Sequence, residues 1–259
     1  MEERNWEDLN MDCLANVFGR VGIESLLLDV PFVCKSWSKA SLSPLCWQRL
    51  IFPNMSPDPW CYYDFFTYRL MDEYQVKGIF CIASFMKSVI NRSRRSATLV
   101  ALPSCCTEEA LDYVAQECPD LRDLQLPGNL HRDFMLKIPS LISKWKNLEH
   151  IRCDFDIPIL AQISIHCKNF HSLTLTGAYI GKEQASAIVS LLQNIRYLDL
   201  SYAYIEKENL LRVLQGCKEL VHFDISKCIS LKVDDEILKL GSRIRTFKCI
   251  MCKDDVQRL

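Results

Sequence analysis

One spacing of apolar residues recurs along most of this chain and restricts the folds that it can adopt. In the stretch that ends at Leu200, apolar side chains occupy the first, fourth and sixth places, at Ile195, Leu198 and Leu200. The alternation of Leu198 and Leu200 predicts a short β-strand with one buried face, because successive side chains of a strand point to opposite sides. The same spacing also begins at Ala97, Leu121, Leu148, Phe170, Leu220 and Ile244.

The starting points of these stretches lie 24, 27, 22, 25, 25 and 24 residues apart. Self-similarity with such a period indicates a solenoid, in which each repeat buries its apolar face against the next. Between the strands, apolar residues such as Leu111, Val114 and Cys118 share one helical face, so each repeat should also contain a helix. Pro139 is expected to begin one of these helices. The sequence therefore predicts an α/β solenoid over residues 96–259, with about seven repeats of which the last is incomplete, a curved parallel sheet and outer helices.

The repeats resemble the leucine-rich-repeat family, whose pattern is L-x-x-L-x-L followed by a polar residue and a returning helix. Leu121, Leu124 and Leu126 match this pattern, and Cys228 stands where the family has Asn or Cys after the strand.

Side chains between the buried strand positions are expected to face outward on the concave side of the sheet, where such a row can bind a protein. The candidate substrate-binding residues are Gln125, His150, Arg152, Thr174, Tyr197, Asp199, His222, Asp224 and Lys248. Tyr197, Arg152 and His222 are the preferred anchors because of their residue types and places. A plainer alternative is that this polar row only keeps the sheet face soluble.

Residues 6–52 predict a compact set of helices ahead of the repeats. The first helix has an apolar stripe, Pro31 can begin a later helix, and a last short segment completes the set. The apolar residues of these segments are Met11, Leu14, Val17, Phe18 and Val21, then Val33, Cys34, Trp37 and Ala40, and finally Leu45, Trp47 and Leu50. A module so small with so many large apolar side chains is expected to bury part of its surface against a partner.

The order of motifs in this module resembles an F-box, especially the plant type, over residues 5–52. The motifs are Leu9, the helix Ala15-Asn16-Val17-Phe18, the segment Val33-Cys34-Lys35-Ser36-Trp37, and Trp47. Asn10 follows Leu9 where the family has proline. The resemblance implies a module that binds a Skp-family adaptor and, through it, a cullin. It places the adaptor contacts on Leu9, Leu14, Val17, Phe18, Val33, Cys34, Trp37 and Trp47, with Phe18 and Trp47 shared between the core and the interface.

An F-box followed by leucine-rich repeats resembles the substrate-recognition subunits of SCF-type ubiquitin ligases, in which the repeats hold a target protein for ubiquitination. This resemblance implies a non-catalytic subunit without a cofactor, at work in the nucleus or the cytoplasm. Two alternatives stay open: a scaffold that binds the adaptor without ubiquitin transfer, and a bare repeat-based interaction module.

A proline-rich break, which includes Pro53, Pro57 and Pro59, separates the module from the repeats. Aromatic residues and then a helical pattern that ends near Asn91 follow this break. Because the end of a solenoid must cover its core, we expect residues 53–95 to be a linker and the N-terminal cap of the repeats.

Composition narrows the possible partners. The net charge of −1 creates no global field that would attract nucleic acid. The first residues lack the basic and then apolar layout of a secretory signal, and the longest apolar run, residues 78–86, is too short to span a bilayer. We therefore expect an intracellular protein that binds neither nucleic acid nor a membrane.

The fourteen cysteines do not have the arrangement of a disulfide framework. One place in successive repeats is occupied by Cys118, Trp145, Cys167, Leu192, Cys217 and Gly241, which indicates a packing position for reduced thiols. Cys249-x-x-Cys252 has the spacing of half a zinc site, but no second pair of ligands is nearby, so we predict no metal site. No phosphate loop, GxSxG or HExxH motif is present, and we predict no catalytic residue. An enzyme that uses a cysteine with a histidine base is the third alternative.

Overall fold

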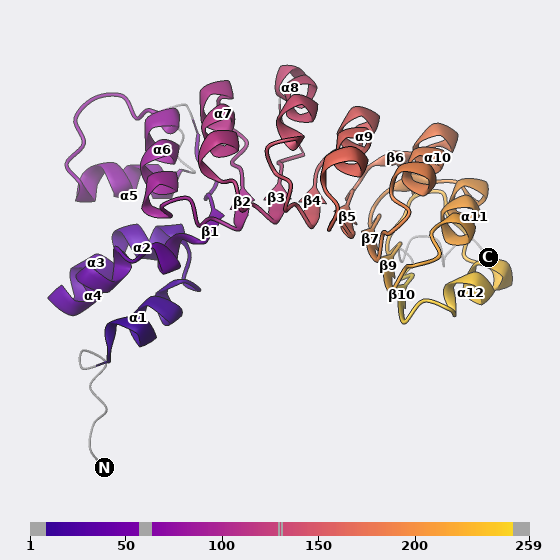
Figure 1. Ribbon diagram of the computed structural model, residues 1–259, viewed down its shortest axis with the longest axis horizontal. Helices are drawn as coiled ribbons and strands as arrows, with labels where there is room; N and C mark the ends of the chain where they lie inside the picture. The colour runs from indigo at the N-terminus through magenta and orange to yellow at the C-terminus, as the bar shows by residue number, and fades with distance from the viewer. Residues whose placement is uncertain (1–8, 57–63, 129, 131, 251–259) are drawn as a thin grey trace, which may run out of the picture. The chain divides into compact units, whose positions relative to one another are not determined.

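The computed structural model describes residues 9–56, 64–128, 130 and 132–250 (Figure 1). The chain divides into two compact units, unit 1 with residues 1–135 and unit 2 with residues 136–259. The parts of the predictions that concern residues 5–8, 57–63 and 251–259, including Cys252, lie outside the described residues.

Unit 1 begins with the helical module that the sequence predicts. Asn10 caps the first helix, because its Oδ1 accepts a hydrogen bond from the N–H of Cys13 at 2.8 Å. The elements of the module are α1 (Met11–Phe18), α2 (Ile23–Leu28), α3 (Val30–Val33), α4 (Lys35–Ser41) and the 3-10 helix η2 (Pro44–Trp47). Their core includes Leu14, Phe18, Ile23, Leu26 and Trp47, all of which are buried.

The parallel sheet of unit 1 begins earlier in the chain than the sequence analysis predicts. Its strands are β1 (Arg49–Ile51), β2 (Leu99–Ala101) and β3 (Asp123–Gln125), and they pair in that order. Leu50 aligns with Val100, and Val100 aligns with Leu124, so all three continue one buried row. The expectation of a helical segment that includes Leu50 is therefore wrong.

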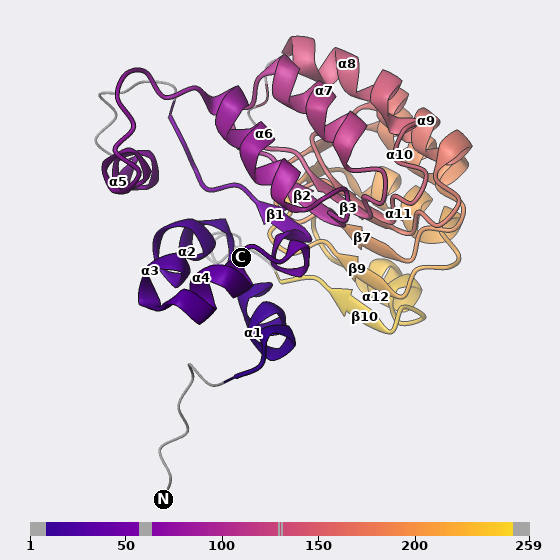
Figure 2. The ribbon, with the colours of Figure 1, turned by 60° about the vertical axis from the view of Figure 1, so that its left-hand side comes forward.

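A sequence signal for β1 was present. Trp47, Leu50 and Phe52 have the same first, fourth and sixth spacing as the other repeats, and all three side chains are buried. The helices α5 (Phe65–Glu73) and α6 (Ile82–Arg92) follow β1, and α7 (Glu108–Glu117) follows β2. Figure 2 shows α6 and α7 on one side of β2 and β3. The segment expected to cap the repeats thus forms the connection between the first two strands.

Unit 2 repeats the arrangement of a parallel strand followed by a helix. Its main strands pair in the order β4 (His150–Arg152), β5 (Ser172–Thr174), β7 (Tyr197–Asp199), β9 (His222–Asp224) and β10 (Thr246–Lys248). Its helices include α9 (Ile157–His166), α10 (Lys182–Leu191), α11 (Lys207–Gly216) and α12 (Asp235–Gly241). A second small sheet, which the sequence did not predict, pairs β6 (Tyr179–Ile180) with β8 (Tyr204–Ile205).

The helix α8 (Arg132–Ile142) corrects one prediction. Pro139 lies inside this helix rather than at its start. Proline lacks the N–H that would bond to the preceding turn, but Ile138, Leu141 and Ile142 are buried on the apolar face of α8. Burial of this face accounts for a helix that runs through the proline.

The predicted strand register is confirmed within each unit. The buried row includes Val100 and Leu124 in unit 1 and Ile151, Leu173, Leu198 and Phe223 in unit 2, each with no exposed surface. Phe247 and Cys249, at the corresponding places of the last repeat, are partly exposed. The parallel strands and intervening helices are those of a leucine-rich-repeat α/β fold.

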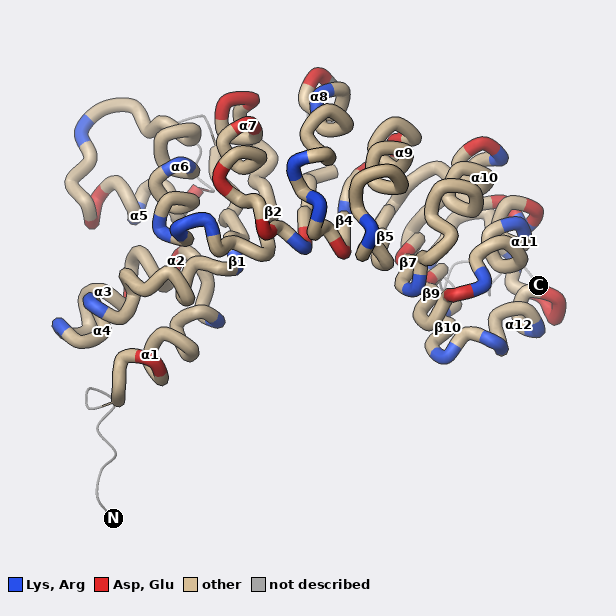
Figure 3. Tube along the Cα trace, viewed as in Figure 1, with Lys and Arg blue, Asp and Glu red and all other residues tan. Residues whose placement is uncertain are grey.

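Two further features of the repeats follow from simple chemistry. The predicted packing position is buried in each repeat, and the Cys167 thiol there donates a hydrogen bond to the Trp145 carbonyl at 3.4 Å. Acidic residues lie in the first turn of α7, α10, α11 and α12, where they complement the helix dipole (Figure 3).

Among the described residues, no helix has the length and apolar character needed to cross a membrane.

Candidate protein-interaction surfaces

The helical module exposes several of the apolar residues that the F-box resemblance assigns to the adaptor. Val17 is 44% exposed and Val33 is 53% exposed, and Leu9 is also on the surface. Cys34 is partly exposed, with its Sγ 3.1 Å from the Ser36 hydroxyl. Exposed valines and leucines in so small a module are candidates for contact with a partner.

Three of the eight proposed adaptor contacts lie instead in the core of the module. Leu14, Phe18 and Trp47 are almost completely buried, so their side chains are not available on its surface. The indole Nε1 of Trp47 donates a hydrogen bond to the Ser41 carbonyl at 2.7 Å, and the Arg92 guanidinium lies over the ring at 4.9 Å. Phe18 and Trp47 thus have the core part of the shared role expected for them, and Leu14 is a core residue as well. The adaptor contacts themselves stay predictions.

Trp37 lies between these two groups. It is partly exposed, and its ring packs edge-on against Phe18 with 5.0 Å between ring centroids. A residue in this place can contact a partner with one edge while the other edge fills the core.

Sequence analysis missed several exposed apolar residues of the module as candidate contacts. These are Met11, Val21, Phe32, Leu42 and Leu45. Met11 and Val21 fit the spacing of one apolar helix face, so the pattern does not mark them as exposed; α1 ends at Phe18, before Val21. Leu14 and Phe18 occupy the buried side of α1, which leaves Val17 outside.

The sheet face of unit 2 carries two rows of polar and aromatic side chains. Strand pairing aligns His150, Ser172, Tyr197, His222 and Thr246 in one row. The second row is Arg152, Thr174, Asp199, Asp224 and Lys248. Eight of the nine predicted substrate-binding residues lie in these rows, because they alternate with the buried positions. Gln125 lies on β3 in unit 1, where its Nε2 donates to the Asp123 carboxylate at 3.3 Å.

Tyr197 is the centre of an aromatic group on this face. It is 42% exposed, and its ring lies 5.8 Å from the His171 ring and 6.5 Å from the His222 ring, measured between centroids. His171 was not among the predicted contacts because it precedes the strand by one residue. Exposed tyrosines in aromatic groups are frequent anchors of protein interfaces.

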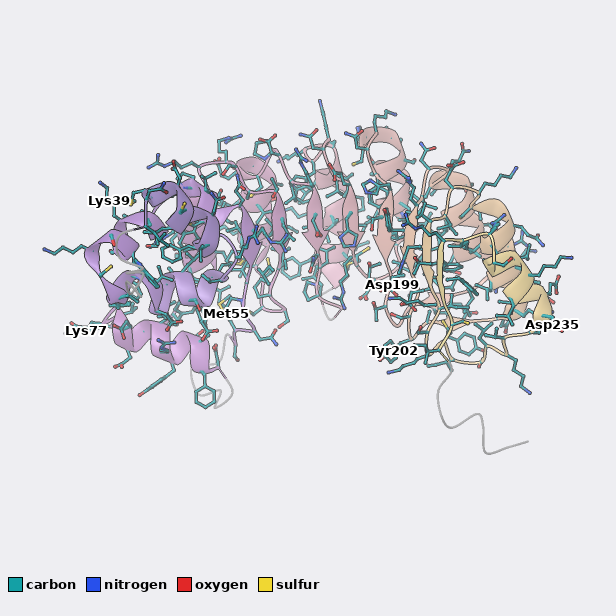
Figure 4. All side chains as sticks on the ribbon, turned by 90° about the horizontal axis from the view of Figure 1, so that it is seen from below. Lys39, Met55, Lys77, Asp199, Tyr202 and Asp235 are labelled. Atoms are coloured by element: carbon teal, nitrogen blue, oxygen red, sulfur yellow. The ribbon has the colours of Figure 1, made fainter. Side chains whose placement is uncertain are left out.

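Several polar residues of the second row also stabilise the repeats themselves. The Oδ1 atoms of Asp199 and Asp224 accept hydrogen bonds from the N–H groups of Ser201 and Ser226, each at 2.8 Å, and so hold the turn after each strand. Lys248 Nζ lies 3.6 Å from Asp224 Oδ2. In Figure 4, Asp199 lies among the strands, whereas Asp235 lies on α12. These two aspartates thus have a structural role in the turns, which differs from both the expected binding role and the plainer alternative of solubility.

The cysteines of the repeats have the environment of packing residues. Burial raises the pKa of Cys118 to about 12 and the pKa of Cys167 and Cys217 to about 11. A thiol with such a pKa is a poor nucleophile near neutral pH. Cys81 differs, because a hydrogen bond from the Ser84 hydroxyl, at 3.2 Å, lowers its pKa. Within the described part of the chain, no group of three or more His, Cys, Asp or Glu side chains could hold a metal ion.

A helical module with exposed apolar side chains, followed by parallel strand-and-helix repeats, defines a leucine-rich-repeat protein with an N-terminal helical module. No protein-family model matches the chain. Three curated relatives from Arabidopsis thaliana are similar to it over most of its length. An F-box/LRR-repeat protein is 26% identical, with 96% of this chain and 87% of the relative covered. The F-box protein SKIP1 is 25% identical, with 96% and 87% covered, and the F-box protein FBW2 is 22% identical, with 92% and 73% covered.

These relatives and the two-part architecture support an assignment of the chain to the F-box/leucine-rich-repeat family. The resemblance recognised in the motifs from Leu9 to Trp47 is thereby confirmed as a family assignment.

Proposed function

We propose that this chain is the substrate-recognition subunit of an SCF-type ubiquitin ligase. In this proposal the exposed apolar surface around Val17 and Val33 binds a Skp-family adaptor, which connects the chain to a cullin. The observation that carries the proposal is the contrast in burial: the apolar ladder of the repeats is buried, whereas the F-box module leaves Leu9, Val17, Phe32 and Val33 on its surface. Desolvation of such a surface by a partner is favourable.

The sheet face of unit 2 is proposed to hold the target protein. Tyr197 with its two histidine neighbours offers a ring surface, and Arg152 and Lys248 offer charges on the adjacent row. The chain itself makes no bond in this mechanism. It raises the effective concentration of a target lysine near the ubiquitin-conjugating enzyme, which converts a bimolecular encounter into a positioned one. The proposed place of action is the nucleus or the cytoplasm.

The adaptor assignment is tested with surface substitutions rather than core truncations. Leu14→Ala would remove a core contact, so its effect could come from unfolding. Val17→Lys and Val33→Lys change exposed residues near helix ends, where lysine suits the helix dipole. The matched control is Ile165→Lys on α9, at a side chain that is 56% exposed.

Co-purification with a Skp-family adaptor should give a stable complex for the wild-type chain and for Ile165→Lys. The double variant Val17→Lys/Val33→Lys should lose the complex while its circular dichroism spectrum stays unchanged. Absence of a wild-type complex would overturn the proposed docking role. A complex that forms but supports no ubiquitin transfer in a reconstituted reaction would identify a scaffold instead.

A further inference from the structure

At the junction between α2 and α3, two backbone carbonyls lack hydrogen-bond donors from the following turn. In a continuous α-helix, the Leu27 carbonyl would accept a hydrogen bond from the N–H of residue 31, but residue 31 is proline and has none. The Phe32 N–H bonds to the Asp29 carbonyl at 3.2 Å instead of continuing the ladder from Leu28. The last two carbonyls of α2 therefore need donors from elsewhere in the chain.

Two side chains from the region of α5 supply these donors. The Tyr74 hydroxyl donates to the Leu27 carbonyl at 2.8 Å, and Arg69 Nη2 donates to the Leu28 carbonyl at 3.0 Å. The same Arg69 nitrogen lies 2.6 Å from Asp29 Oδ1. Both donors come from more than 40 residues later in the chain. Figures 1 and 2 both place α5 beside α2.

The junction is linked directly to the apolar surface of the module. Phe32, the residue after Pro31, packs edge-on against the Tyr74 ring with 6.3 Å between centroids. Val33 comes next and ends α3. The hydrogen bond from Arg69 also holds the pKa of the Asp29 carboxyl below its ordinary value, as expected for a carboxylate paired with a guanidinium. The contacts of Arg69 and Tyr74 thus fix the turn from which both exposed residues project.

The other side of α5 is anchored in the repeats. Phe66 of α5 packs against Phe85 of α6 with 5.6 Å between ring centroids, and Phe85 also contacts Phe52 at 6.2 Å. The Asp64 side chain caps α5 by accepting from the Thr67 N–H at 2.9 Å. The helix α5 therefore connects the F-box helices to the first repeat.

We infer that α5 belongs to the adaptor-binding module. Its residue Arg69 and the adjacent Tyr74 are positioning residues, which hold Phe32 and Val33 in the conformation that the partner binds. The inference rests on the proposed adaptor role of the surface that contains these two residues. It extends the module beyond the end of the F-box resemblance at residue 52, to Tyr74.

An exposed ion pair alone contributes little to stability, so the test must separate the junction contacts from surface charge. Tyr74→Phe removes one hydroxyl and keeps the ring beside Phe32. Arg69→Met keeps most of the side-chain volume and removes the donors. The matched control is Arg95→Met, which breaks the exposed pair of Arg95 and Glu117, 3.0 Å apart, in the same unit but away from α2.

Two measurements on the whole chain described above test the inference. The first is calorimetric titration with a Skp-family adaptor, and the second is hydrogen exchange of residues 28–33 in the chain without the adaptor. For Arg69→Met/Tyr74→Phe we expect adaptor binding about 10-fold weaker, and exchange in residues 28–33 about 10-fold faster, since a tenfold change corresponds to the loss of one or two net hydrogen bonds. Arg95→Met should change neither.

Unchanged exchange in residues 28–33 together with unchanged adaptor affinity would overturn the inference. Faster exchange throughout unit 1 would also overturn it, because α5 would then be a general stabiliser rather than a positioning element. Failure of the wild-type chain to bind the adaptor would refute the proposed function, and with it the adaptor role of α5. The exchange measurement would still show independently whether Arg69 and Tyr74 fix the junction.

Discussion

The repeats of unit 2 and the helical module of unit 1 use apolar residues in opposite ways. In the repeats, each leucine of the ladder is buried against its neighbours, and polar or aromatic side chains such as Tyr197 occupy the exposed face. In the module, a small core leaves Val17, Phe32 and Val33 exposed. An apolar residue at a ladder position of the repeats therefore indicates packing, whereas an exposed apolar residue of the module can indicate contact with a partner.

The two regions also differ in the range of the contacts that complete them. Each strand of the repeats pairs with the strand of the next repeat, so its backbone groups are satisfied by the nearest similar unit. The junction of α2 and α3 is completed by Arg69 and Tyr74, which belong to a helix after the first strand. Stability in the repeats is therefore local, whereas the module depends on a distant segment.

The largest expected effect is the difference in stability loss between two truncations to alanine, one in the repeats and one in the module. Leu198→Ala should lower the free energy of unfolding by roughly 2–5 kcal/mol, because it leaves a cavity in the ladder. Val33→Ala should change it by less than about 0.5 kcal/mol, because the side chain is exposed. Urea unfolding followed by circular dichroism measures both. Equal losses of stability would refute the contrast between the buried ladder and the exposed module surface.

The second expected effect concerns thiol reactivity. At pH 8, a thiol with a pKa of about 11, such as that of Cys167, is thiolate only about once in a thousand molecules, and it is also buried. Cys13 of the module is exposed. Iodoacetamide followed by peptide mass spectrometry should show alkylation of Cys13 at least about 100-fold faster than that of Cys167. The difference should vanish in urea, and a fast Cys167 in the folded chain would contradict its role in packing.

The smallest effect distinguishes two glycines. A Cβ at Gly216, at the end of α11, would lie 2.4 Å from Val189 Cγ1 and 3.0 Å from Val189 Cβ, so rotation of the valine cannot remove the clash. Gly216→Ala should destabilise the protein by roughly 1–2 kcal/mol, since overpacking outweighs the gain in helix propensity. Thermal unfolding of Gly216→Ala/Val189→Ala should show recovery relative to the sum of the single changes.

Gly22 in the module supplies the control. Its φ of 89° disfavours any residue with a Cβ, although no atom lies within 4 Å of the place that a Cβ would occupy. Gly22→Ala should therefore cost about 1 kcal/mol through the backbone alone, and truncation of a neighbour should not restore it. Rescue of Gly22→Ala by such a truncation would show that packing governs both sites.

Much of the repeat architecture could be predicted because its signal is periodic. The spacing of Ile195, Leu198 and Leu200 identifies the strand, its buried face and, by alternation, the exposed places of Tyr197 and Asp199. The same spacing at Trp47, Leu50 and Phe52 is ambiguous in the sequence, because these residues also fit a helical module. The exposed residues of the module were predicted less well: Leu14 and Val17 have similar side chains, but only their places on α1 decide which one is buried.

The sequence by itself determined the repeat, its register and the resemblance to the F-box/leucine-rich-repeat family, because the period of 22 to 27 residues and the order of motifs are local properties of the chain. Only the tertiary structure decided that β1 belongs to the sheet and that α5 completes the F-box helices. The physical reason is the same in both cases. Pro31 leaves the Leu27 carbonyl without its helical donor, and β1 has no pairing partner near it in sequence. In both places the partner comes from a residue more than 40 positions away.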